Sequence, residues 1–120
     1  MAECRVLLVE DNADNLALVR FLLERSGYTV IEANNGVRGL ELARNELPDL
    51  ILMDLSLPEM DGWAVASEVH RRWPGVKVVL ITGHAVPPEM VASNRELVSE
   101  VIFKPIRFDD LSSTMSHVLS

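Results

Sequence analysis

Residues 50–54 read Leu50-Ile51-Leu52-Met53-Asp54, an apolar run that ends in a carboxylate. The residues that follow, 55–62, include a proline and a glycine, which are typical of a turn. A short apolar run bounded by turn residues is typical of a strand that is buried on both faces. The stretch therefore predicts a strand of a parallel sheet with Asp54 at its carboxyl end.

Four further apolar runs are predicted to be strands: residues 5–10, 28–33, 76–82 and 101–104. Helical patterns follow all five runs, with stop signals at Gly27, Pro48 and Pro74 and a start signal at Pro87-Pro88. Strand and helix alternating five times predict an α/β fold, a doubly wound five-stranded parallel sheet with five helices. We expect the strand order 2-1-3-4-5.

Each predicted helix carries an apolar stripe that we expect to face the core. The stripes are, in chain order, Leu16, Val19, Leu22 and Leu23; Val37, Leu40, Ala43 and Leu47; Val65, Ala66, Val69 and Trp73; Met90, Val91, Leu97 and Val98; and Phe108, Leu111, Met115, Val118 and Leu119.

Composition limits the classes of function. The 120 residues fit one compact domain, residues 1–120, and the formal net charge of −7 with no basic cluster argues against nucleic-acid binding. A single cysteine excludes a disulfide framework and a zinc cluster. No apolar segment reaches the roughly 20 residues that span a bilayer, and no signal peptide is evident, so we expect a soluble, cytoplasmic protein. The start at Met1 and the end in the last helix favour a stand-alone protein or an amino-terminal fragment.

Polar residues close four of the predicted strands: Glu10 with Asp11, then Asp54, Thr82 and Lys104. Ligands of open parallel sheets bind at the carboxyl ends of the strands, where the strand order reverses. With strands 1 and 3 adjacent, the three carboxylates would cluster and repel one another, and a divalent cation relieves that repulsion. Oxygen ligands suit Mg²⁺ better than zinc.

Asp54 is a candidate nucleophile toward phosphorus, because a carboxylate can attack a phosphoryl donor to give an acyl phosphate. Lys104 would supply positive charge, and the Thr82 hydroxyl could donate to a phosphoryl oxygen. Each residue also has an ordinary interpretation. Asp54 could simply form a turn, and residues 10–14 could form an Asx turn that caps a helix. Lys104 could be no more than the residue at which the chain leaves the last strand. Their order, each closing a separate strand, favours the functional interpretation.

Residues 7–12, 53–62, 81–85 and 103–105 carry motifs that resemble the receiver domain of two-component response regulators, a family of flavodoxin-like fold. The resemblance covers essentially the whole chain and implies a phosphorylation-dependent signalling switch rather than a turnover enzyme. It implies that Asp54 accepts phosphate from a sensor histidine kinase or a histidine phosphotransfer protein. A downstream protein target or an output domain would then respond.

The resemblance also implies residue roles. Asp11, Asp54 and the backbone carbonyl of Ser56 would ligate Mg²⁺, and Glu10 would act through a metal-bound water. Lys104 would contact the phosphoryl group, Thr82 would swing toward it, and a cis peptide would precede the proline after Lys104. Ser56 and His84 occupy positions that tune the phosphate lifetime in the family.

Two features concern partners and signal output. Leu18 and Phe21 fall beside the core stripe of the first helix, where family members dock the phosphodonor, and we expect them to contact it. Val101 stands where the family usually has Tyr or Phe, whose ring moves with the threonine. Phe103 lies on the same strand face as Val101, and we expect it to be a core residue, with a substitute for the missing switch aromatic as the alternative.

Three alternatives remain open. A flavin-binding module of the same architecture would need a phosphate-cradling loop after the first strand, where residues 10–14 are acidic. A hydrolase resembling the haloacid dehalogenases would need a second aspartate two residues after Asp54, where Ser56 stands. A docking receiver that acts without phosphorylation is disfavoured by the intact Asp54, Thr82 and Lys104.

Overall fold

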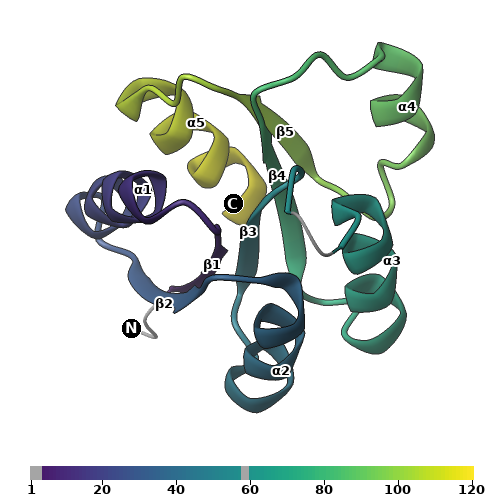
Figure 1. Ribbon diagram of the computed structural model, residues 1–120, viewed down its shortest axis with the longest axis horizontal. Helices are drawn as coiled ribbons and strands as arrows, with labels where there is room; N and C mark the ends of the chain where they lie inside the picture. Colours follow the sequence, from purple (N-terminus) through teal and green to yellow (C-terminus); the bar gives the residue numbers. More distant parts are fainter. Residues whose placement is uncertain (1–3, 58–59) are drawn as a thin grey trace.

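The computed structural model describes residues 4–57 and 60–120, so Pro58 and Glu59 of the turn after Asp54 lie outside the described residues. One sheet runs through the middle of the molecule (Figure 1). Its strands are β1 (Arg5–Val9), β2 (Thr29–Ala33), β3 (Leu50–Asp54), β4 (Lys77–Thr82) and β5 (Glu100–Phe103). All neighbouring strands pair in parallel in the order β2-β1-β3-β4-β5, as predicted.

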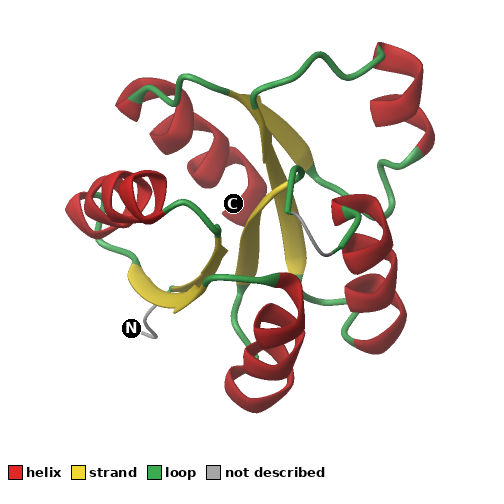
Figure 2. Cartoon of the chain, in the orientation of Figure 1, coloured by secondary structure: helices red, strands yellow, loops and turns green. Residues whose placement is uncertain are grey.

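Five helices in the described part of the chain cover both faces of the sheet (Figure 2). They are α1 (Ala13–Arg25), α2 (Gly36–Glu46), α3 (Gly62–Arg72), α4 (Pro88–Ser93) and α5 (Phe108–Leu119). Side chains from α1 and α5 form one core cluster with the sheet, whereas α2, α3 and residues around α4 form the other. None of the helices in residues 4–57 and 60–120 has the length and apolar character needed to cross a membrane.

The three central strands are buried almost throughout. Every residue of β3 is buried, and so are four of the five residues of β1 and five of the six of β4. Helices on both faces exclude water from these strands, which is why their sequences read as unbroken apolar runs. The acidic and hydroxyl side chains appear only where the strands reach the edge of this core.

Local signals set the helix ends. The Asn12 side chain accepts a hydrogen bond from the Asn15 N–H at 3.0 Å and caps α1, which ends before Gly27 with its φ of 94°. Pro88 is the first residue of α4. The predicted strands agree with the structure to within one residue at each end, so Glu10 and Lys104 lie just beyond their strands.

The predicted core stripe of α2 is wrong in part. Val37 and Leu47 are each 60% exposed, whereas Ala43 is buried as predicted and Leu40 packs against the core. The other buried residues of α2 are Gly36 and Gly39. A Cβ added at Gly39 would lie 2.9 Å from a methyl carbon of Val9, so α2 packs too close to β1 for larger side chains. Small residues thus replace the apolar stripe at this contact, and much of the stripe stays on the surface.

The predicted stripes of the fourth and fifth helices also need correction. Helix α4 ends at Ser93 and contains no buried residue, and Met90 is 43% exposed. Val98 is buried, but it lies beyond the helix. At the start of α5, Phe108 is 37% exposed, because the buried face of this helix begins one turn later, at Leu111.

Candidate metal and phosphoryl-transfer site

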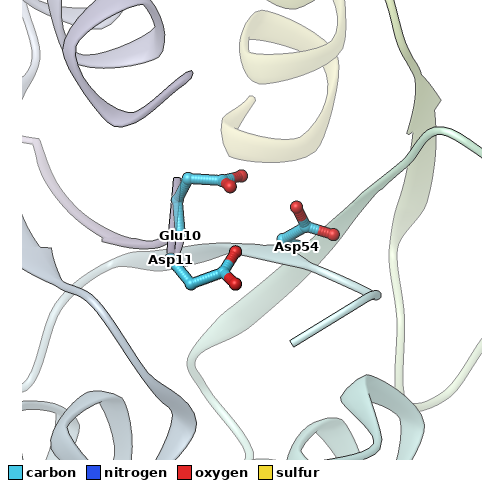
Figure 3. A group of neighbouring side chains, drawn as sticks. All are labelled: Glu10, Asp11 and Asp54. Carbon is cyan, nitrogen blue, oxygen red and sulfur yellow. The ribbon is translucent and has the colours of Figure 1, made fainter. Parts of the chain in front are cut away.

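The register of the sheet brings three carboxylates together. Val9 of β1 pairs with Met53 of β3, so the residues that follow each of them, Glu10 and Asp54, are neighbours. Oxygen atoms of Glu10, Asp11 and Asp54 all lie within 4.8 Å of one another. Figure 3 shows the three side chains pointing toward a common space. The sequence predicted this cluster from the strand order alone.

Lys104 reaches the same cluster from the far side of β4. Its main-chain N–H donates to the Thr82 carbonyl at 2.8 Å, which aligns the end of β5 with the end of β4. Its Nζ atom lies 2.8 Å from Asp54 Oδ2 and 3.9 Å from Glu10 Oε2. One ammonium therefore partly neutralises two buried carboxylates. The bond between Lys104 and Pro105 is cis, as the family resemblance implied.

Main-chain groups hold the two buried acids. The Ser56 N–H donates to Asp54 Oδ1 at 2.7 Å, and the Asn12 N–H donates to Glu10 Oε1 at 3.1 Å. Asp54 is 2% exposed and Glu10 is 1% exposed, so both need such partners to offset the loss of water. Among the described residues, no buried side-chain polar atom lacks a hydrogen-bond partner. The helix cap at Asn12 and the acidic cluster therefore coexist; the two interpretations of residues 10–14 were not exclusive.

The pKa values of the two buried acids shift in opposite directions. Burial, together with a hydrogen bond shared with Asp54, raises the pKa of Glu10 to about 7. Burial acts on Asp54 in the same direction, but the hydrogen bonds from Lys104 and the Ser56 N–H outweigh it and lower the pKa of Asp54. The lowered pKa favours the carboxylate form of Asp54, which is the form that a nucleophile needs, whereas burial favours the protonated form of Glu10.

The donor set fits a hard divalent cation. Three carboxylates converge, no histidine or cysteine belongs to the cluster, and Asp11 is exposed at its mouth. Carboxylate oxygens with access to solvent suit Mg²⁺, which retains several waters when it binds to proteins. A cation here would also favour the ionised form of Glu10, which burial disfavours.

Thr82 connects the site to the loop before α4. Its side chain is fully buried, its Oγ1 accepts a hydrogen bond from the His84 N–H at 3.0 Å, and its hydroxyl lies 3.3 Å from the His84 carbonyl. The hydroxyl is thus engaged with the loop rather than with Asp54. The His84 and Ser56 side chains are exposed, and no described hydrogen bond involves either side chain.

A groove of about 430 Å³ opens beside Lys104 between α1 and the loop that leads into α5. Leu18 of α1 is 48% exposed and lines it, together with Pro105 and Ile106, and Phe21 is 58% exposed on the same helix. Phe108 at the start of α5, which the sequence placed in the core, is 37% exposed and contacts α1, with the Arg25 guanidinium 5.4 Å from its ring centre.

The expectation for Phe103 is wrong. Phe103 is 51% exposed, whereas Val101, two residues earlier, is buried against the cluster that contains Val98. β5 is the edge strand of the sheet, and the strand face that buries Val101 leaves Phe103, at the carboxyl end of the strand, uncovered. Val101, at the position that is usually aromatic, is thus a small core residue that has neither a hydroxyl nor a ring whose rotation could carry a signal.

Comparisons with known proteins agree with this geometry. The sequence profile of the family described as "Response regulator receiver domain" matches residues 6–116. The polar-differentiation response regulator DivK of Brucella anthropi is 36% identical over 119 residues, which cover 95% of this chain and 94% of DivK. The transcriptional regulatory protein GlrR of Escherichia coli strain K12 is 33% identical over 114 residues.

The extent of these matches differs. The match to GlrR covers 95% of this chain but only 26% of that protein, so the chain spans about a quarter of the length of such relatives. Among solved structures, a CheY-like response regulator receiver domain protein from Methanospirillum hungatei superposes with a TM-score of 0.90. It is 31% identical, and the match covers 98% of this chain and 94% of that one.

Proposed function

The chain belongs to the response regulator receiver domain family, and from this premise we propose that it switches a signalling pathway by accepting a phosphoryl group on Asp54. Receiver domains are signalling domains and not turnover enzymes on a separate substrate. The observation that carries the proposal is the Asp54 carboxylate, buried, with a lowered pKa and 2.8 Å from the Lys104 ammonium. We also propose that residues 1–120 act as one receiver unit.

The transfer itself forms one bond and breaks one. A carboxylate oxygen of Asp54 attacks the phosphorus of a phosphohistidine on the donor, the new P–O bond forms, and the P–N bond breaks with its electron pair left on the imidazole. This reaction needs positioning and charge neutralisation more than covalent assistance. The Ser56 N–H orients Asp54, and the Lys104 ammonium, which contacts Asp54, can form an ion pair with the transferred phosphoryl oxygens.

We propose that Asp11, Asp54 and the Ser56 carbonyl would hold Mg²⁺, with Glu10 acting through a bound water. When bound, the ion supplies charge neutralisation for the phosphoryl oxygens. Glu10 and Asp11 do not attack phosphorus in this scheme. Their role is to bind and orient, and the closeness of their oxygens to Asp54, within 4.8 Å, supports it.

The switch would start at Thr82. A phosphoryl group on Asp54 offers oxygen acceptors at the strand ends, and the Thr82 hydroxyl could leave the His84 main chain to donate to one of them. The loop that begins at Gly83 would then lose an anchor. Ser56 and His84, exposed beside the site, are proposed to tune how fast water removes the phosphate.

Partner contacts are proposed at two places. A histidine kinase or a histidine phosphotransfer protein would dock on the apolar surface of Leu18 and Phe21, which borders the groove beside Lys104. A downstream protein or an output domain would bind where α4 and its loop change. A flavin-binding module is disfavoured by the receiver-family match and by the acids after β1.

The test is incubation with acetyl phosphate and Mg²⁺, read by intact mass. We expect the wild-type chain to gain one phosphate and an Asp54→Asn variant to gain none. A receiver known to react serves as the control for the reagent. If that control reacts and this chain shows no gain that depends on Asp54, the proposal fails, and a docking receiver that needs no phosphorylation becomes the better description.

A further inference from the structure

The apolar stripe of α2 that the sequence assigned to the core remains largely on the surface. Val37 and Leu47 are each 60% exposed, and Leu40 is only half-buried. Val37, Leu40 and Arg44 recur at spacings of three and four residues, so they follow one face of the helix, and Leu47 caps its end. Apolar side chains that line one helix face without cover are typical of a surface that binds something.

A groove runs along this face. It has a volume of about 210 Å³ and is lined by Val37, Leu40, Glu41 and Arg44 of α2 and by Arg72 of α3. Figure 1 shows α2 and α3 next to each other on the same side of the sheet, away from α1 and α5. The groove is therefore separate from the proposed donor surface and could be occupied while a donor is bound.

The charge around the groove is positive on balance, although Glu41 also lines it and the chain as a whole carries −7. Arg38 pairs with Glu41 on the same helix, and this pair is neutral. Glu68 accepts from both Arg71 and Arg72, so two guanidinium groups share a single carboxylate.

Arg44 adds a further positive charge to the rim. No described carboxylate forms an ion pair with it. Apolar residues thus form the floor of the groove, and arginines of α2 and α3 stand at its rim. This combination fits an occupant that is apolar on one side and acidic at its edges.

We propose that the groove between α2 and α3 docks an acidic amphipathic helix of a partner protein. Leucine-like side chains of that helix would pack on Val37 and Leu40, and its carboxylates would face Arg44 and Arg72. A second copy of this chain is a poorer occupant, because the same arginines would then face each other across a two-fold axis. Nucleic acid is disfavoured by the net charge of −7 and by the apolar floor.

The probe is a synthetic acidic peptide of about 15 residues with leucines at helical spacing, long enough to cover the exposed face of α2. A control peptide has the same composition with the leucines out of register. Titration into the isotope-labelled chain, followed by amide chemical shifts, should move the signals of α2 and α3. The control peptide should move them much less.

Charge reversal supplies the matched variants. Arg44→Glu should weaken binding of the acidic peptide roughly fivefold, because it replaces a favourable rim charge by a repulsive one. Arg95→Glu makes the same change at an exposed position outside the groove and should leave binding unchanged. Val37→Ser, also at an exposed position, tests the apolar floor without disturbing the core.

Several outcomes would overturn the proposal. They are no shifts in α2 and α3 at millimolar peptide, equal binding of the out-of-register peptide, or equal weakening by Arg95→Glu. Self-association that Val37→Ser abolishes would assign the groove to a second copy instead. None of these measurements involves phosphate, so their failure leaves the proposal for Asp54 untouched, and the reverse also holds.

Discussion

At the scale of single residues, Lys104 and the proposed cation depend on the same carboxylates. The Lys104 ammonium lies 2.8 Å from Asp54 and 3.9 Å from Glu10. A divalent ion bound by those acids would stand within a few ångströms of this charge. Like charges at such a distance repel even in water. Lys104 should therefore weaken the binding of Mg²⁺ while it prepares the site for a phosphoryl group.

Lys104→Met should tighten the binding of Mg²⁺ roughly tenfold, the effect of removing one unit charge a few ångströms from a divalent ion in a strongly screening medium. Calorimetric titration of Mg²⁺ into both proteins checks this. Lys104→Arg, which keeps the charge, is the control and should stay near wild type. Weaker binding in the methionine variant would show that Lys104 organises the acids rather than competes for them.

Leu47 adopts a backbone conformation that is unfavourable for a residue with a side chain. It caps α2 with a φ of 44°, in the left-handed region where a Cβ is strained, and it is 60% exposed. Leu47→Gly should raise the free energy of unfolding by roughly 0.5–1 kcal/mol, the relief of strain less the greater entropy of glycine in the unfolded chain. Urea denaturation measures the change. Leu47→Ala retains the Cβ and should give no gain.

Among the secondary-structure elements, α1 has one face that packs in the core and another, exposed face that is available to the donor. Val19, Leu22 and Leu23 are buried against the sheet, whereas Leu18 and Phe21 point away from it. The two sets interleave along one helix because its period of 3.6 residues directs neighbours to different sides. Exposed aromatic residues of this kind often dominate the free energy of a protein–protein contact.

Phe21→Ala should slow phosphoryl transfer from a phosphohistidine protein roughly tenfold and leave the reaction with acetyl phosphate unchanged, since only the protein donor needs the surface. Rapid-quench assays with both donors measure the two rates. Met90→Ala, at an apolar residue of α4 that is 43% exposed, is the matched control. Equal slowing with both donors would mean that Phe21 supports the site and not the docking.

At the scale of the whole molecule, the open question is how a change at Asp54 reaches the surface. Val101 is buried and has no ring to move, so the usual aromatic position of β5 offers no moving ring, and Phe103, the aromatic residue of this strand, stands exposed two residues further on. The described contact between Thr82 and the His84 main chain leads instead into the loop before α4. That helix contains no buried residue, and its packing therefore resists movement less than that of the other helices.

Thr82→Val should accept phosphate on Asp54 but should lose the response of the loop and α4, because valine keeps the shape of the side chain and lacks the hydroxyl. Hydrogen exchange across residues 83–93, with and without acetyl phosphate, measures that response. Thr82→Ser restores a hydroxyl and should recover it. An undiminished response in the valine variant would place the signal path elsewhere.

Most of the secondary structure could be predicted from hydrophobic periodicity and from glycine and proline residues at the ends of the elements. The five strands, their order and the placement of Glu10, Asp54 and Thr82 at strand ends could be predicted, because buried parallel strands read as apolar runs and ligands gather at their carboxyl ends. The exposure of Val37, Met90 and Phe103 could not. Periodicity tells which residues share a face, but it does not tell how closely that face approaches its neighbour.

The fold and the chemical inventory of the site follow from the amino-acid sequence, since local pattern and strand-end position are properties of the chain. How that inventory is used depends on the tertiary structure. It shifts the pKa values of Glu10 and Asp54 in opposite directions, through burial and the reach of Lys104. It also packs Gly39 of α2 closely on Val9 and leaves Val37 of the same helix at the surface. Both effects depend on distances between segments far apart in the chain, which no local pattern contains.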